Sequence, residues 1–208
     1  MELLNNPPPF LDTGETCGGF DFAAGGDENV FAAGHGNRFF IADHWADPDT
    51  VGARGRFRRK AVELGIPADR IFADGDGLGL PIIDDFRAEG FPVHSYRGGF
   101  PSDDTQAFVN LRAQAWRALA RAIEEKELIL DIDEDTIEQL VAPRVQTDAI
   151  GRVKIESKED MAKRGVRSPD RADALVMAWH ARRHSGLVRN LGAWYARHPA
   201  QKRAIGRY

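Results

Sequence analysis

The sequence predicts one α/β domain in which helices flank a central mixed β-sheet. Near the N-terminus, three consecutive apolar segments joined by short Gly- and Asn-containing turns predict an antiparallel meander. Further along, the period of the apolar residues changes, and helical segments alternate with short strands. The 208 residues provide enough chain for one large buried core.

The overall composition is that of an ordinary globular protein, with 29% charged and 42% hydrophobic residues. No apolar run approaches the roughly 20 residues that span a bilayer, and the N-terminus lacks the pattern of a signal peptide. We therefore expect no membrane partner. The single cysteine, Cys17, excludes an intrachain disulfide and fits a reducing compartment, so a cytosolic location is the default.

The elements follow in order along the chain. Residues 1–17 contain a Pro- and Asn-rich segment and are expected to form a linker or lead-in, and residues 18–185 the folded domain. Helical spacing or helix signals occur at Val51–Leu64, at Pro81–Glu89, from Phe108 to Ile123 and from Ser168 onward. Strands are expected before the turn at 25–29 and at Val30–Ala33, Arg38–Ala42, Ile71–Ala73, Pro92–Tyr96 and around Val153 and Ile155; Leu128–Leu130 is either a strand or a helix exit.

The last helix has a clear start signal. Ser168 is expected as its N-cap and Pro169 as its first helical residue. Residues 186–208 form a basic C-terminal tail, since no acidic residue follows Asp173. This tail either binds phosphates by counterion release or is a solubilising helical segment, and charge alone does not decide between the two.

Acidic side chains stand where a ligand site is expected. Asp21 and Asp74 each follow an apolar run, and ligand sites in open α/β sheets form at the carboxyl ends of strands. Asp170 and Asp173, three residues apart, share one face of the last helix. Oxygen ligands of this kind suit Mg²⁺ or Mn²⁺, and two such ions about 4 Å apart promote phosphodiester hydrolysis.

Each acid also has a structural explanation. Asp170 lies where a negative charge stabilises the helix dipole, and Asp74 stands in an Asp-Gly turn. Asp21 lies between Phe20 and Phe22 and is the hardest to explain without a partner.

Several other motifs are incomplete. The Gly-rich turn at 75–80 lacks the third glycine of the dinucleotide fingerprint, and no phosphate-binding loop is present, so no ATPase site is expected. His180 and His184 lie one helical turn apart without a third ligand, and we interpret them as exposed helix residues.

Taken together, the segments resemble the nuclease domain of the large terminase subunit of tailed bacteriophages. The resemblance covers Gly19 to about Arg182. The segments that carry it are Gly19-Phe20-Asp21-Phe22-Ala23 with Gly26-Asp27, Asp74-Gly75-Asp76-Gly77-Leu78-Gly79, Phe108-Val109-Asn110-Leu111-Arg112-Ala113-Gln114-Ala115-Trp116, Ile155-Glu156-Ser157-Lys158-Glu159-Asp160-Met161 and Ser168-Pro169-Asp170-Arg171-Ala172-Asp173-Ala174.

This resemblance implies an RNase H-like (retroviral-integrase-like) fold with an acidic site for two Mg²⁺ or Mn²⁺ ions. By the resemblance Asp21 and Asp74 are metal ligands, and the third comes from the last helix, where Asp173 is favoured over Asp170. Lys158 and Arg164 are candidates for contacts to phosphates, with a solvated charge as the alternative for both.

The resemblance also implies an endonuclease that cleaves concatemeric double-stranded DNA during viral genome packaging. The implied partners are the ATPase motor domain, the small terminase subunit and the portal protein, and the implied location is the host bacterial cytoplasm. A motor is not encoded here, so the sequence is either an excised domain or a separately encoded nuclease. Two other hypotheses are a junction resolvase or other RNase H-like nuclease, and a catalytically silent DNA-binding or assembly module.

Overall fold

The computed structural model describes residues 7–23, 25, 27–77 and 79–184 of the chain. The predicted basic tail at 186–208 lies outside the described residues, so its role stays a prediction. In the described part of the chain, no helix combines the length and the apolar character that crossing a bilayer requires.

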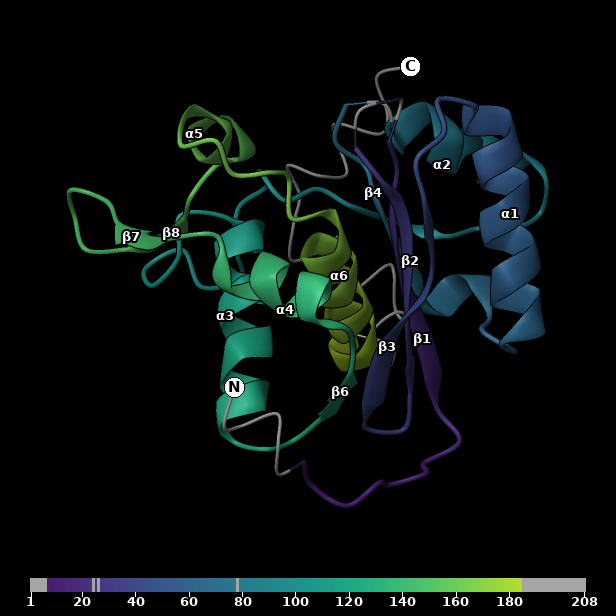
Figure 1. Ribbon diagram of the computed structural model, residues 1–208, viewed down its shortest axis with the longest axis horizontal. Helices are drawn as coiled ribbons and strands as arrows, with labels where there is room; N and C mark the ends of the chain where they lie inside the picture. The colour runs from purple at the N-terminus through teal and green to yellow at the C-terminus, as the bar shows by residue number, and fades with distance from the viewer. Residues whose placement is uncertain (1–6, 24, 26, 78, 185–208) are drawn as a thin grey trace.

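A six-stranded mixed sheet forms the centre of the fold (Figure 1). Its strands are β1 Thr16–Asp21, β2 Asn29–His35, β3 Arg38–Trp45, β4 Ile71–Asp74, β5 His94–Tyr96 and β6 Ile129–Asp131. They lie in the order β5-β4-β1-β2-β3-β6. The first three are the predicted antiparallel meander. β4 lies parallel to β1, β5 lies parallel to β4, and β6 lies parallel to β3 at the other edge.

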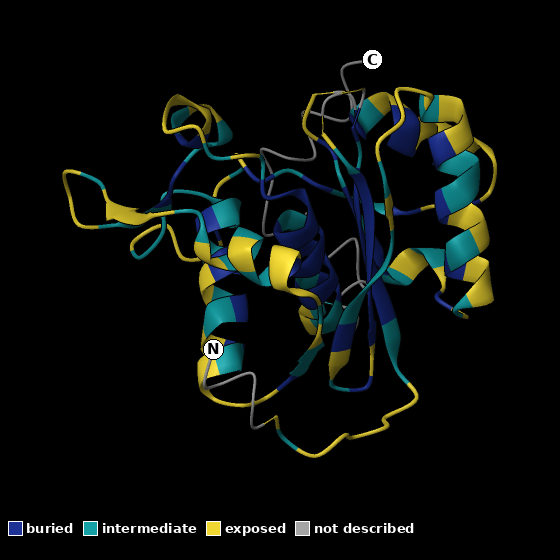
Figure 2. Ribbon diagram, in the orientation of Figure 1, coloured by how far each residue is buried: buried dark blue, intermediate teal, exposed yellow. Residues whose placement is uncertain are grey.

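Helices cover both faces of this sheet. They are α1 Thr50–Glu63, α2 Gly79–Ala88, α3 Leu111–Glu124, α4 Glu134–Val141, α5 Lys158–Lys163 and α6 Asp170–His184, with a short 3₁₀ turn at Ala68–Arg70. Figure 1 shows α1 and α2 on one side of the sheet and α3, α4 and α6 on the other. In Figure 2 the darkest, most buried ribbon runs through the central strands and α6.

The two cores are separated by the alternation of side chains along β1. Phe20 belongs to the core under α1 and α2, where its ring stacks on that of Phe57 at a centroid distance of 4.5 Å. Cys17 belongs to the core under α3 and α6. Because neighbouring residues of a strand point to opposite faces, Asp21 is directed to the α6 side, away from the Phe20 ring.

A separate two-stranded sheet projects from the body next to α5 (Figure 1). It consists of β7 Val145–Thr147 and β8 Val153–Ile155. The predicted strand around Val153 is thus confirmed, but it lies outside the central sheet. Its link to the body is a bridge between Val153 and Phe108.

The lead-in is attached to the body rather than free. The backbone N–H of Leu11 donates to the side chain of Asn37 at 2.8 Å, and the Asn37 side chain donates to the carbonyl of Pro9 at 3.0 Å. Asn37 follows Gly36, whose φ of +58° turns the chain from β2 into β3. Part of the predicted lead-in is therefore fixed to this turn.

Two local predictions are wrong. His180 is not an exposed helix residue: its ring packs edge-on against Phe72 and Tyr96, at centroid distances of 4.8 and 5.4 Å. Ser168 does not cap α6, because its hydroxyl donates to the Asp170 side chain instead of accepting a backbone N–H. The carbonyl of Pro169 accepts the first helical bond, from the N–H of Asp173, so Pro169 occupies the cap position.

Candidate active site

Asp21 and Asp74 lie side by side at one edge of the sheet. Asp21 is the last residue of β1 and Asp74 the last of β4. These strands are parallel neighbours with Phe20 opposite Ala73, so the next residue of each strand emerges at the same place. Asp21 is only 2% exposed. Two acids therefore lie next to each other at the carboxyl ends of two adjacent core strands, and Asp21 is buried there.

The last helix reaches this edge because β1 contains a glycine below it. A Cβ atom at Gly19 would lie 2.1 Å from the carbonyl oxygen of Ala174 and 2.6 Å from the backbone nitrogen of Ala178. The absence of a side chain at Gly19 therefore allows α6 to lie directly on β1. As a result the first turn of α6, with Asp170 and Asp173, is brought over the end of β1.

The ammonium group of Lys158 stands at the centre of the acids. Its Nζ lies 3.6 Å from Asp21 Oδ2, 3.4 Å from Asp170 Oδ1 and 3.4 Å from Asp173 Oδ2. Lys158 is the first residue of α5, and the Ser157 side chain caps this short helix by accepting the N–H of Asp160. We call Asp21, Asp74, Asp170 and Asp173 the acid cluster.

Two members of the acid cluster, Asp21 and Asp74, have clearly raised pKa values. Burial raises the pKa of Asp21 well above its usual value; the Lys158 ammonium opposes this effect, and the charge of Asp74 adds to it. Burial likewise raises the pKa of Asp74 to about 6, against a hydrogen bond from the N–H of Asp76 that lowers it.

For Lys158, burial and the neighbouring charges act in opposite directions. Burial by itself lowers the pKa of its ammonium, but the attraction of the carboxylates of Asp21 and Asp173 outweighs burial, and the pKa is raised. A protonated lysine therefore offsets part of the repulsion among the acids.

Asp170 is held from the loop between β1 and β2. The N–H of Glu28 donates to Asp170 Oδ2 at 3.1 Å. The Glu28 side chain is itself bound by Arg171, whose Nε and one terminal nitrogen donate hydrogen bonds to its two carboxylate oxygens at 2.8 and 3.0 Å. Arg171 also donates to Asp133 at 3.0 Å. This bidentate contact fixes Glu28, from which Asp170 receives its hydrogen bond.

Asp173 is held from α3. Its Oδ1 accepts the indole N–H of Trp116 at 3.0 Å and a guanidinium N–H of Arg112 at 3.3 Å. Both acids of the first turn of α6 therefore have protein donors. By contrast, Oδ2 of Asp21 is buried and has no hydrogen-bond partner within the described part of the chain.

The structure thus brings together the acids that the sequence singled out, and adds one cation to them. Lys158, predicted as a phosphate contact, lies among the acids. Arg164 makes a bidentate contact with Glu156 at 2.7 and 2.6 Å and donates to the carbonyl of Ala142, so its role at a phosphate stays a prediction. Among the described residues, no three His, Cys, Asp or Glu side chains have the arrangement of a metal site.

Sequence reasoning missed the residues that hold the acids in place. These are Gly19, Glu28, Arg112, Trp116 and Arg171. Arg112 and Trp116 belong to a segment that the sequence singled out, but with no role assigned; their spacing of four on a helix was the available signal.

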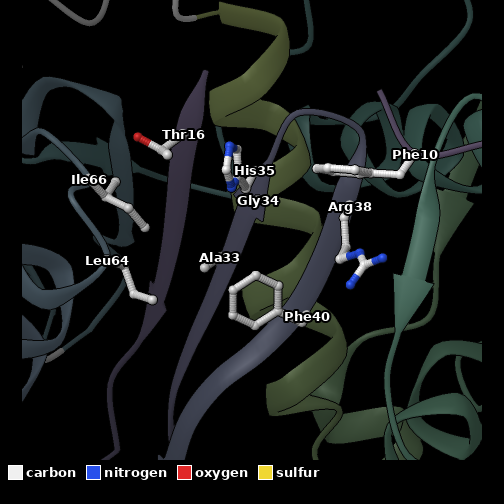
Figure 3. A pocket seen from close by; sticks show the side chains of 9 residues that line it. All are labelled: Phe10, Thr16, Ala33, Gly34, His35, Arg38, Phe40, Leu64 and Ile66. Carbon is white, nitrogen blue, oxygen red and sulfur yellow. The ribbon is translucent and has the colours of Figure 1, made fainter. Parts of the chain in front are cut away.

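A cavity of about 220 Å³ lies at the opposite end of the sheet (Figure 3). Its walls come from the lead-in, β2, β3 and the segment after α1, and include Phe10, His35, Arg38, Phe40 and Ile66. None of its lining residues is an acid. It is therefore distinct from the acid cluster, and we assign no function to it.

Comparison with known proteins gives one consistent picture. No family model matches the sequence. A curated protein, described as the probable large subunit of the terminase of Enterobacteria phage P7, is 32% identical over 117 residues, which are 54% of this chain. The matched part is 24% of that protein's length, so the chain spans about a quarter of its curated relative.

Solved structures with a similar fold are nuclease domains of large terminase subunits. The domain of gp2 from bacterial virus Sf6, a point mutant with manganese and beta-thujaplicinol, has a TM-score of 0.70 at 22% identity, over 79% of this chain and 87% of that one. The domain from thermophilic phage G20c with bound magnesium has a TM-score of 0.59 at 19% identity, over 82% and 83%. The expected RNase H-like fold, a mixed sheet flanked by helices, is confirmed, as is the resemblance to terminase nuclease domains.

Proposed function

We propose that this chain is the nuclease part of a viral DNA-packaging terminase and that it hydrolyses phosphodiester bonds of double-stranded DNA. The observation that carries the proposal is the meeting of acids from β1, β4 and α6 around one point at the edge of the sheet. The similarity to the phage P7 protein and to the terminase nuclease domains supports it.

The chemistry of the acid cluster fits divalent cations. It offers carboxylate oxygens alone, which is the donor set that Mg²⁺ and Mn²⁺ prefer. Asp21 Oδ2 is buried without a hydrogen-bond donor among the described residues, and the Lys158 ammonium stands 3.6 Å from it, beyond hydrogen-bond distance, so this oxygen is still available to a divalent ion. We propose Asp21, Asp74 and Asp173 as ligands, with Asp170 as a further one. Two bound ions would activate a water molecule and stabilise the leaving oxygen.

Asp173 is favoured over Asp170 by its place in the acid cluster. Burial is the main cause that raises the pKa of Asp21 and Asp74; the charge of Asp173 adds to it at both groups, and that of Asp170 adds to it at Asp21. Asp170 lies nearer to the β1–β2 loop, where it accepts the Glu28 N–H. The choice of Asp173 as the third ligand therefore stays part of the proposal, with Asp170 next to it.

In this proposal Lys158 has two tasks. Without metal, its ammonium offsets the repulsion among the acids that surround it. Its side chain is 39% exposed, and in this proposal the ammonium also attracts the phosphate of an approaching strand. Because a cation and a divalent ion are attracted to the same carboxylates, the affinity for metal is set partly by the displacement of Lys158.

The wider biological role belongs to the same proposal. The chain would cut concatemeric viral DNA in the host bacterial cytoplasm, together with an ATPase motor domain, a small terminase subunit and a portal protein. These partners follow from the similarity to a large terminase subunit, of which this chain matches about a quarter.

The test is plasmid cleavage with Mg²⁺ or Mn²⁺, and with EDTA as the metal-free reference. The variants are Asp21→Asn, Asp173→Asn and Asp170→Asn, with Asp84→Asn, an exposed acid of α2, as the matched control. We expect metal-dependent nicking and linearisation that Asp21→Asn and Asp173→Asn abolish and Asp84→Asn retains. Loss with Asp21→Asn but not with Asp173→Asn would assign the third ligand to Asp170.

One observation favours a second function, a catalytically silent DNA-binding or assembly module. Lys158 already occupies the centre of the acid cluster, as a structural ion pair would. If that is its only role, the folded wild-type protein cuts DNA with neither metal, and Asp21→Asn leaves DNA binding unchanged. A four-way junction offered beside linear duplex in the same assay separates a junction resolvase from both alternatives.

A further inference from the structure

Two polar side chains of α3 converge on a single oxygen of the acid cluster. Arg112 and Trp116 are four residues apart and therefore lie on one face of the helix. Both donate to Oδ1 of Asp173, at 3.3 and 3.0 Å. The Arg112 guanidinium also lies over the Trp116 ring, 5.3 Å from its centroid.

We propose that Arg112 and Trp116 are positioning residues that set the orientation of the Asp173 carboxylate for metal binding. This inference rests on the proposed nuclease function. With Oδ1 engaged by two donors, the rotation of the carboxylate is fixed, and Oδ2 faces the centre of the acid cluster, 3.4 Å from Lys158 Nζ. A ligand oxygen held in this way does not need to be ordered when the ion arrives.

Arg112 has a second contact that extends this effect to Lys158. Its other terminal nitrogen donates to the carbonyl of Glu156 at 2.8 Å, two residues before Lys158. One planar guanidinium thus joins Asp173 on α6 to the segment that leads into α5. A lysine at position 112 keeps the charge but lacks the fork of donors that spans both acceptors.

Both side chains are largely buried. Trp116 is 7% exposed and belongs to the core under α6. The side chain of Arg112 is 17% exposed, and its backbone N–H donates to the carbonyl of Gly98 at 2.9 Å. Both donors to Asp173 are therefore placed by the packing of α3.

The test uses two conservative variants, each with a matched control. Trp116→Phe removes the indole N–H, and its control is Trp179→Phe, because Trp179 is also buried and its N–H has no acceptor among the described residues. Arg112→Lys removes the fork, and its control is Arg117→Lys on the exposed face of α3, where Arg117 pairs with Glu124. Thermal melting without metal verifies that all four proteins are folded.

The first measurement is the dissociation constant for Mn²⁺ by calorimetry, beside kcat and KM for plasmid cleavage. We expect Trp116→Phe and Arg112→Lys to weaken Mn²⁺ binding by roughly 10-fold or more, as loss of an outer partner of a metal ligand does. We expect kcat to fall and KM for DNA to stay within about 2-fold, because neither residue is proposed to contact DNA. The control variants should match the wild type in all three quantities.

The second measurement needs no cleavage. In protein with ¹⁵N-labelled tryptophan, the indole signal that disappears in Trp116→Phe should shift when Mg²⁺ is added, and that of Trp179 should not. Mn²⁺ affinities of Trp116→Phe and Arg112→Lys equal to those of their controls, in a wild type that binds Mn²⁺, would overturn the positioning role alone. A folded wild type that neither binds Mn²⁺ nor cuts DNA would overturn the proposed function, and this inference with it.

Discussion

A methyl group at position 19 should separate α6 from the sheet. In Gly19→Ala the new Cβ would stand 2.1 Å from the Ala174 carbonyl oxygen, whereas real Cβ atoms essentially never come within 3.0 Å of a neighbour. The difference, 3.0 − 2.1, requires a movement of at least 0.9 Å. The obstacle is helix backbone, which has no rotamer by which to yield, so the helix itself must shift.

The cost of this shift follows from what α6 buries. Most of its residues are buried, including Leu175 and Met177. Overpacking usually costs about 1–3 kcal/mol, and gaps opened beside a displaced helix add to it, so we expect a loss of about 2–4 kcal/mol. For a domain of this size that loss lowers the melting temperature by roughly 4–16 °C. The same movement carries Asp173 away from Asp21, so metal binding should weaken as well.

The assay is thermal and urea unfolding of Gly19→Ala beside Gly99→Ala. Gly99 is the matched control, because a Cβ there meets no atom within 4 Å and the residue has no left-handed φ. We expect the control to stay within about 0.5 kcal/mol of the wild type. If Gly19→Ala melted within about 2 °C of Gly99→Ala, α6 would not lie directly on β1, and the account of how Asp173 reaches the acid cluster would be wrong.

Three further predictions concern the acid cluster and the core. Lys158→Met leaves the acids without their cation, so the free energy of unfolding without metal at neutral pH should fall by about 1–3 kcal/mol. This loss is less than for a fully buried pair because Lys158 is partly exposed. Mg²⁺ should then raise the melting temperature of the variant more than that of the wild type. The pKa of Asp74, raised to about 6, makes this group bind more protons in the native than in the unfolded state between about pH 4 and pH 6, so its contribution to the free energy of unfolding should decrease as the pH rises through this range. Urea titrations of the wild type and Asp74→Asn should isolate this contribution as the difference between their two pH profiles; equal profiles would contradict the assignment. Burial raises the pKa of the Cys17 thiol to about 12, so iodoacetamide at pH 8 should label the unfolded protein and leave the native protein unmodified, as mass spectrometry would report.

The parts of the fold that were predictable are those in which one local signal dominates. The meander followed from apolar segments separated by Gly-containing turns. Asp21 was conspicuous because a carboxylate between two phenylalanines of a strand has few explanations. The strand at the end of which Asp74 lies was recognisable from Ile71 onward, and parallel pairing then places both acids at one edge.

What the sequence did not reveal depends on contacts between distant elements. Nothing local distinguishes Lys158 from a solvated lysine, since its position follows from where the start of α5 lies relative to the first turn of α6. His180 was misjudged for a similar reason: a histidine on a helix is ordinarily exposed, but β4 and β5 place Phe72 and Tyr96 against it. The sequence favours Asp173 over Asp170 without excluding Asp170, and in the structure both lie in the first turn of α6 and reach Lys158.

β1 and α6 run antiparallel, so the acid cluster is separated from the other end of these two elements by their full length. The acid cluster lies at one end of this pair of elements, and the ion pair between Glu15 and Arg182 lies at the other. A strand of six residues and a helix of fifteen both span about 20 Å, which is therefore the distance between the two ends. A tether attached before Glu15 or a label placed at Arg182 would therefore lie at the end of β1 and α6 that is farther from the acid cluster. Such an attachment would leave the neighbourhood of the acids unaltered, which makes this end the suitable place for a label in the cleavage and metal-binding assays.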